Sequence, residues 1–133
     1  MYLNQLSKEQ KNLFLDLCIY AVVANQEMND DEVGCIKQYC DEMNFTEVRY
    51  TAQYTVDEAI DKLIEVSERR ELRIVLLELT ALVMCDGNYD DSEKAFINKI
   101  AEAANITEVE KIQIHDAISD LFYIYEKIER LMN

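Results

Sequence analysis

A unit of helix, acidic turn and helix occurs twice in this chain. When the sequence is shifted by 61 residues, residues 15–48 align with residues 76–109 at nine identical positions, whereas unrelated segments of this length share about two or three. The clearest match closes each copy, where Asn44-Phe-Thr-Glu-Val48 aligns with Asn105-Ile-Thr-Glu-Val109. This repeat predicts two similar halves that fold in the same way.

The first helix of each copy is strongly apolar. In the first copy, Ser7 and Gln10 have the spacing of a capping box, and the apolar residues that follow lie on one helical face. In the second copy, residues 72–84 are apolar nearly all round, which is typical of a helix surrounded by others. We therefore expect residues 72–84 to form the central helix.

The second helix of each copy follows a short acidic turn. Asn29 and Asp90 are the expected N-cap residues, and Glu32 and Glu93 stand at the third helical position, where they complete capping boxes. Asparagine tolerates the left-handed conformation that closes a helix. We expect these helices to end near Asn44 and Asn105, and the next helices to start at Thr46 and Thr107.

The remaining segments are also predicted to be helical. Residues 49–73 connect the copies, and Thr55 with Glu58 forms another capping box. Residues 108–132 are amphipathic, as one long helix or two short ones, with apolar residues at spacings of three, four, three and four: Ile118, Leu121, Tyr125, Ile128 and Met132. The nearby aromatic residues fit a core position or, as the alternative, a partner or dimer face: Phe122, Tyr123 and Tyr125.

The turn residues available to the chain support an all-α fold. There is no proline, and the two glycines are Gly34 and Gly87, so most of the turn chemistry that sheets of short strands require is missing. Half of the 133 residues are apolar, enough for one core. We expect residues 1–133 to form a compact single-domain bundle of helices, built from repeats at about 13–48 and 74–109.

The charge of the chain limits its partners. The formal net charge is −14, from 27 carboxylates against 13 Lys and Arg, and such a chain repels nucleic acid and anionic lipid. Neither nucleic acid binding nor membrane insertion is expected; the charge favours cations or a basic protein surface, or serves solubility alone. The first residues lack a signal-peptide pattern, and the four cysteines fit buried reduced thiols in a cytoplasmic protein: Cys18, Cys35, Cys40 and Cys85.

The acidic turns are the candidate metal sites. Carboxylate and amide oxygens suit calcium or magnesium, and the second turn offers a set of four: Asp86, Asn88, Asp90 and Glu93. The turn is not an EF-hand, because the sixth position of that loop is Asp91 instead of glycine and the twelfth is Ile97 instead of glutamate. Helix capping alone explains the same acidic residues, so both interpretations stay open.

Few residues indicate catalysis. The single histidine, His115, has no neighbouring nucleophile motif, and no Gly-rich phosphate loop is present. Glu78, inside the apolar helix, is a functional carboxylate or, as the alternative, reaches the surface or a basic partner such as Arg73, Lys37 or Lys99. The basic cluster of Arg69, Arg70 and Arg73 balances neighbouring carboxylates or docks an acidic partner. We expect no enzymatic activity and no catalytic or cofactor-binding residues.

The second copy, from Leu79 to Glu93 with the apolar positions that follow it, resembles the TerB-like family of tellurite resistance proteins. The matching residues are Asp86-Gly87, at the end of the apolar helix, and Glu93 in the next helix. This resemblance implies an all-helical fold of about seven helices, a cytoplasmic role in stress or tellurite response, and a divalent cation at Asp86 and Glu93. In the first copy Asn25-Gln26 replaces Asp-Gly, so a cation is expected at the second turn only.

Two functions follow from these patterns. The first is a non-catalytic TerB-like module that binds a divalent cation at the acidic turn and a protein partner. The alternative is a metal-free helical scaffold or adaptor that acts through self-association or partner docking.

Overall fold

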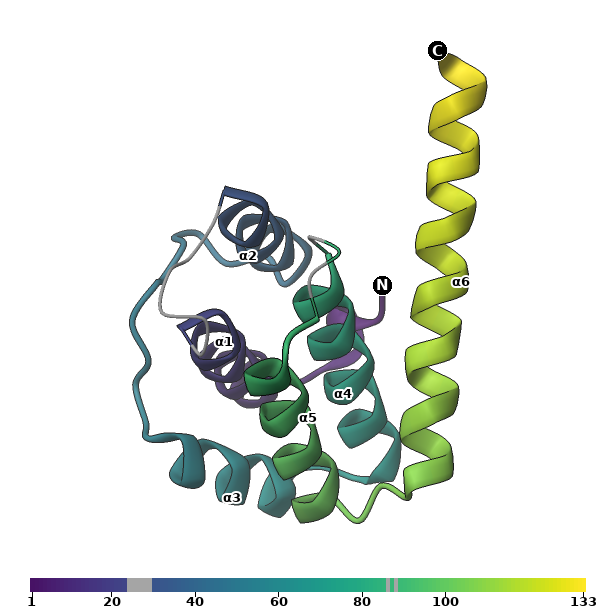
Figure 1. Cartoon of the computed structure of the whole chain (residues 1–133). Helices are drawn as coiled ribbons and strands as arrows, with labels where there is room; N and C mark the ends of the chain where they lie inside the picture. The colour runs from purple at the N-terminus through teal and green to yellow at the C-terminus, as the bar shows by residue number, and fades with distance from the viewer. Residues whose placement is uncertain (24–29, 86, 88) are drawn as a thin grey trace.

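A computed structural model describes residues 1–23, 30–85, 87 and 89–133 of the chain (Figure 1). These residues form a bundle of six α-helices and one 3-10 helix, with no strand among them. In chain order the elements are η1 (Leu3–Gln5), α1 (Lys8–Val23), α2 (Asp30–Glu42), α3 (Val56–Val66), α4 (Arg69–Met84), α5 (Asp91–Ala103) and α6 (Glu108–Met132). None of the helices in the described ranges is long and apolar enough to cross a membrane.

Two helices, α1 and α4, form the centre of the bundle. Figure 1 shows α1 surrounded by α2, α3, α4 and α5, while α4 also packs against α6. The expected central helix is confirmed, since eight residues of α4 are buried. However, α1 is buried on more than the single face predicted, because Leu15 and Ile19 are buried as well as Leu13, Phe14 and Leu17.

The predicted capping box is complete at the start of α1, while at α3 only its N-cap half forms. At α1, the Ser7 N–H donates to the Gln10 side chain at 2.8 Å and the Gln10 N–H donates to the Ser7 hydroxyl at 3.1 Å. At α3, the Thr55 hydroxyl accepts from the Glu58 N–H at 3.2 Å, but it also donates to the Glu58 carboxylate at 2.9 Å. The predicted cap of α2, Asn29, lies outside the described residues.

The helix ends at Asn44 and Asn105 are also as predicted. Both asparagines adopt the left-handed conformation, with φ of 62° and 56°. Matching backbone hydrogen bonds close both helices, from the Phe45 N–H to the Cys40 carbonyl and from the Ile106 N–H to the Ala101 carbonyl, each at 2.9 Å. The asparagines therefore terminate α2 and α5 in the same way.

The prediction of a helix starting at Thr46 is wrong. Residues 46–55 contain no helix, so the connection between the copies becomes helical only at α3. The predicted connecting helices over residues 49–73 therefore correspond to α3 and the start of α4, preceded by an irregular segment.

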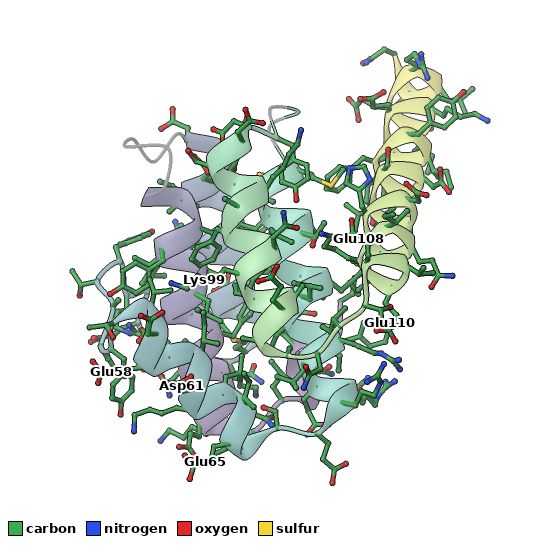
Figure 2. The ribbon with its side chains drawn as sticks, turned by 60° about the horizontal axis from the view of Figure 1, so that its bottom comes forward. Glu58, Asp61, Glu65, Lys99, Glu108 and Glu110 are labelled. Atoms are coloured by element: carbon green, nitrogen blue, oxygen red, sulfur yellow. The ribbon has the colours of Figure 1, made fainter. Side chains whose placement is uncertain are left out.

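The C-terminal segment is one helix of 25 residues, α6, which extends beyond the bundle. Its first half packs against α4, with Ile118 buried and Ile114 packed against the core. Its second half rises away from the other helices in both views (Figures 1 and 2). A core position for the aromatic residues is therefore wrong for two of them, because Tyr123 is 58% exposed and Tyr125 is 56% exposed.

Candidate functional site

The second acidic turn joins α4 to α5, and two of its four predicted metal ligands belong to a helix cap. The Glu93 N–H donates to Asp90 Oδ1 at 2.8 Å, and the Asp90 N–H donates to Glu93 Oε1 at 3.1 Å. This reciprocal pair is the predicted capping box, and it holds the Glu93 side chain in a fully buried position. Asp86 and Asn88 lie outside the described residues.

Within the part of the chain that the structure describes, no three His, Cys, Asp or Glu side chains form a group suited to a metal ion. Gly87 has a φ of +77°, a left-handed conformation that glycine adopts without strain, and its N–H donates to the Met84 carbonyl at 3.1 Å. The cation site at Asp86, Asn88, Asp90 and Glu93 stays a prediction.

The same turn contacts α6 through aromatic rings. Tyr89 stacks on His115 of α6, with ring centroids 5.8 Å apart and planes 22° apart, and the Lys94 ammonium lies 5.5 Å from the Tyr89 ring. Burial, and secondarily the charge of Glu93, raise the pKa of Tyr89. His115 therefore packs against the turn between α4 and α5.

The buried carboxylate of Glu78 does not pair with any of the basic side chains proposed from the sequence. Its Oε1 pairs with the terminal ammonium of Met1 at 2.7 Å and accepts from the Tyr2 N–H at 3.1 Å. Arg73 instead pairs with Glu110, and Lys99 pairs with Asp57. A carboxylate on a buried helix reached by the backbone of the N-terminal segment could not be recognised from charge patterns alone.

A second buried carboxylate, Asp16 of α1, was missed by the sequence reasoning. It is fully buried and pairs with Arg49 from the irregular segment. It also accepts from the backbone N–H groups of Gln53 and Tyr54 at distances of 3.0 to 3.1 Å. The Arg49 guanidinium in turn donates to the carbonyls of Thr51 at 2.6 Å and Asn12 at 3.1 Å. An aspartate within the apolar run from Leu13 to Val22 was the available signal.

The arginine cluster at the start of α4 balances a carboxylate of α6. Arg69 and Arg73 both donate to Glu110, the first at 2.6 Å, and Glu110 also caps α6 through the Thr107 N–H. That backbone hydrogen bond and the two guanidiniums lower the pKa of Glu110 to about 2. The third arginine, Arg70, donates to the neutral side chain of Gln5 at 2.8 Å.

Two of the four cysteines are buried as predicted. Cys18 and Cys40 are buried, and burial raises the pKa of both thiols, so neither is activated as a nucleophile. Cys35 and Cys85 are only half-buried, which departs from the expectation of four buried thiols.

The second half of α6, residues 119–132, is named the α6 overhang, and it carries an apolar stripe. The stripe continues the face that packs on α4, since its residues follow Ile114, Ala117 and Leu121 at alternating spacings of three and four. The stripe side chains are about half exposed or more: Ile124 at 50%, Tyr125 at 56%, Ile128 at 48%, Leu131 at 78% and Met132 at 73%. An exposed apolar stripe of this kind is typical of an interaction surface.

The chain was compared with protein families, curated proteins and solved structures. No family model matches the chain, and searches of curated proteins and of solved structures give no match.

Proposed function

We propose that this chain is a non-catalytic helical interaction module that self-associates, with the α6 overhangs of two copies packed against each other. The observation that supports this most directly is the exposed stripe, because it continues the face that α6 uses to pack on α4. On the first half of α6, Ile118 is buried and Ile114 packs against the core of the same chain, whereas from Ile124 onward the side chains of the stripe are about half exposed or more. A second copy of α6 offers the matching apolar surface.

The length of the overhang favours a partner. An isolated helix of fewer than about 12–15 residues is marginal in water, and most helices in proteins owe their stability to tertiary packing. The overhang has this length and stands apart from the other helices (Figures 1 and 2). Packing against a second copy supplies the missing stabilisation.

The distribution of charge also permits pairing of identical chains. The overhang carries three acidic and two basic side chains, a net charge of −1, while the rest of the chain carries −13. Acidic side chains such as Glu58, Asp61 and Glu65 lie on the outer side of α3, away from the overhang (Figure 2). Since exposed charges further apart than about 8 Å are largely screened at physiological salt, overhang pairing brings little repulsion.

The size of the stripe suits a specific interface. Stable interfaces bury at least about 1,200 Å² in total, or roughly 600 Å² per partner. Five large side chains that are about half exposed or more provide an apolar area of that order. The hydrophobic stripe also excludes charged side chains from its centre, as interface cores do.

The test is the mass of the particle in solution. Multi-angle light scattering and sedimentation equilibrium of the whole chain should give a dimer, and Ile124→Glu with Ile128→Glu should give a monomer. Ile112→Glu is the matched control, because Ile112 is also 50% exposed on α6 but lies in its body-packed half. The control should remain dimeric.

A strict monomer at every concentration of the wild-type chain would overturn self-association. The stripe would then be assigned to a partner of different sequence or to none. Hydrogen exchange separates these outcomes from a failure of folding, since an unpartnered overhang exchanges its amides rapidly while α1 and α4 remain protected.

Membership of the TerB-like family, with stress or tellurite response as its setting, stays a prediction from Asp86, Gly87 and Glu93. Self-association through α6 is independent of it.

A further inference from the structure

A cleft of about 740 Å³ lies between the start of α4 and the first half of α6, outside both the acidic turns and the overhang stripe. Its apolar wall comes from both helices: Ile74, Leu77, Ile114 and Ala117. Cavities that bind small molecules commonly have this size and this mixture of an apolar wall with a few polar groups.

Two guanidiniums, those of Arg70 and Arg73, line the same cleft. They lie three residues apart in the first turns of α4 and therefore on one side of the helix. The positive end of the α4 dipole lies at these turns and adds to the attraction for an anion.

The positive charge in the cleft is only partly neutralised by the protein. Glu110 is the carboxylate that lines the cleft, and two arginines share it, Arg69 and Arg73. Arg70 donates instead to the uncharged Gln5 side chain and lies 5.8 Å from the ring centroid of Tyr2. Among the residues that line the cleft, two arginines stand against one carboxylate, whereas the whole chain has a net charge of −14.

We infer that this cleft binds a small organic anion, in which an apolar body carries a carboxylate or phosphate group. The anionic group pairs with Arg70 and Arg73, because the planar guanidinium fork matches carboxylate and phosphate oxygens. The apolar body packs on the wall formed by Ile74, Leu77 and Ile114. Figure 2 shows Glu110, the partner of Arg73, at the start of α6, so the charged end of a ligand bound to Arg73 lies near that end of the helix.

Calorimetry and isotope-edited NMR with octanoate and octyl phosphate test this site on the whole chain. Both anions should bind at one saturable site and shift the methyl signals of Ile74 and Ile114. Neutral octanol should bind at least about tenfold more weakly, since it makes no ion pair with either arginine.

The variants test the two arginines and the apolar wall of the cleft separately. Arg70→Gln and Arg73→Gln should each weaken octanoate binding about tenfold, and Ala117→Trp should abolish it by filling the cleft while both arginines remain. Arg69→Gln is the matched control, because Arg69 belongs to the same cluster and bonds Glu110 but does not line the cleft; it should bind octanoate within about twofold of wild type.

Three outcomes would overturn the inference. These are the absence of saturable binding for both anions, equal affinity for octanol and octanoate, or wild-type affinity in both Arg70→Gln and Arg73→Gln. Circular dichroism of each variant identifies loss of folding, and Ala117→Trp, which keeps every charge, provides a second route if an arginine variant unfolds.

Discussion

The two copies of the repeat end in nearly the same five residues and then differ completely. Asn44-Phe-Thr-Glu-Val48 is followed by an irregular segment, whereas Asn105-Ile-Thr-Glu-Val109 contains the start of the longest helix of the chain. Both asparagines close the preceding helix with the same left-handed conformation. The difference therefore arises after the asparagine, at the residues that could start a new helix.

The residue three positions after the threonine accounts for part of the difference. After Thr107 it is Glu110, which accepts from the Thr107 N–H at 3.0 Å while the Glu110 N–H donates to the Thr107 hydroxyl at 3.2 Å. After Thr46 it is Arg49, which cannot complete a capping box.

The core accounts for the rest of the difference. Arg49 pairs with Asp16, and the same carboxylate binds two backbone N–H groups of the irregular segment. The position equivalent to Asp16 in the second copy is Leu77, which provides no acceptor. The long-range Asp16–Arg49 contact in the first copy and the local Thr107–Glu110 cap in the second thus give two structures to one sequence motif.

The largest effect is expected from Asp16→Ala. It leaves the Arg49 guanidinium without its carboxylate and removes the acceptor of the Gln53 and Tyr54 N–H groups, so the free energy of unfolding should fall by about 3–5 kcal/mol. Urea denaturation measures it. Asp116→Ala, at an exposed aspartate, should change stability by less than about 0.5 kcal/mol. A similarly small loss for Asp16→Ala would show that the contacts of Asp16 contribute little to stability.

Replacing Asp16 and Arg49 with the residue types found at the equivalent positions of the second copy should change the structure that follows Thr46. In Asp16→Leu with Arg49→Glu, a leucine replaces the buried carboxylate, and the introduced glutamate can complete a cap with Thr46. No buried charge is left unpaired, so the double variant should be about 1–2 kcal/mol more stable than Asp16→Ala. Secondary chemical shifts should become helical after Thr46. An unchanged irregular segment would mean that other contacts hold it.

A smaller effect is expected from removing the two threonines. Thr107→Ala removes the N-cap of α6 and should lower the free energy of unfolding by about 1 kcal/mol. Thr46→Ala is the matched control, because Thr46 is exposed and starts no helix; it should cost less than about 0.5 kcal/mol. If thermal or urea denaturation gave equal losses of stability for the two variants, Thr107 would not differ from Thr46 as a helix cap.

The stability that Glu110 adds at the start of α6 should also depend on pH. The folded pKa of Glu110, about 2, lies below the unfolded value of about 4.3. The contribution of Glu110 to the free energy of unfolding is therefore present above the unfolded pKa and is lost as the pH falls from about 4.3 toward 2. The difference in Tm between wild type and Glu110→Gln should be largest near pH 7 and should shrink with acid. A constant difference from pH 7 to pH 2 would argue against the shifted pKa.

The smallest effect is expected from divalent cations at the acidic turns. Because only the second turn keeps Asp-Gly, calorimetry with calcium, magnesium and manganese should give binding that Asp86→Ala abolishes and Asn25→Ala leaves unchanged. Ion at a concentration equal to Kd should raise the free energy of unfolding by about 0.4 kcal/mol. No heat above buffer for any of the three ions would remove the cation site.

The sequence predicted the helices and their ends well, because these depend on local chemistry. Ser7 with Gln10, Asp90 with Glu93, and Asn105 all act where their spacing placed them. The candidate site was less predictable. The partners of Glu78 and Asp16 come from segments at least 33 residues away in the chain, and no local pattern identifies such contacts.

The sequence by itself determined an all-helical fold, since proline is absent, the apolar residues recur at helical spacing, and caps and asparagines mark the boundaries. Only the tertiary structure decided that residues 46–55 stay irregular, that three arginines and Glu110 gather beside a cleft, and that half of α6 stands outside the bundle. The physical reason is that caps act over three or four residues, whereas buried ion pairs, clefts and exposed faces depend on which helices meet.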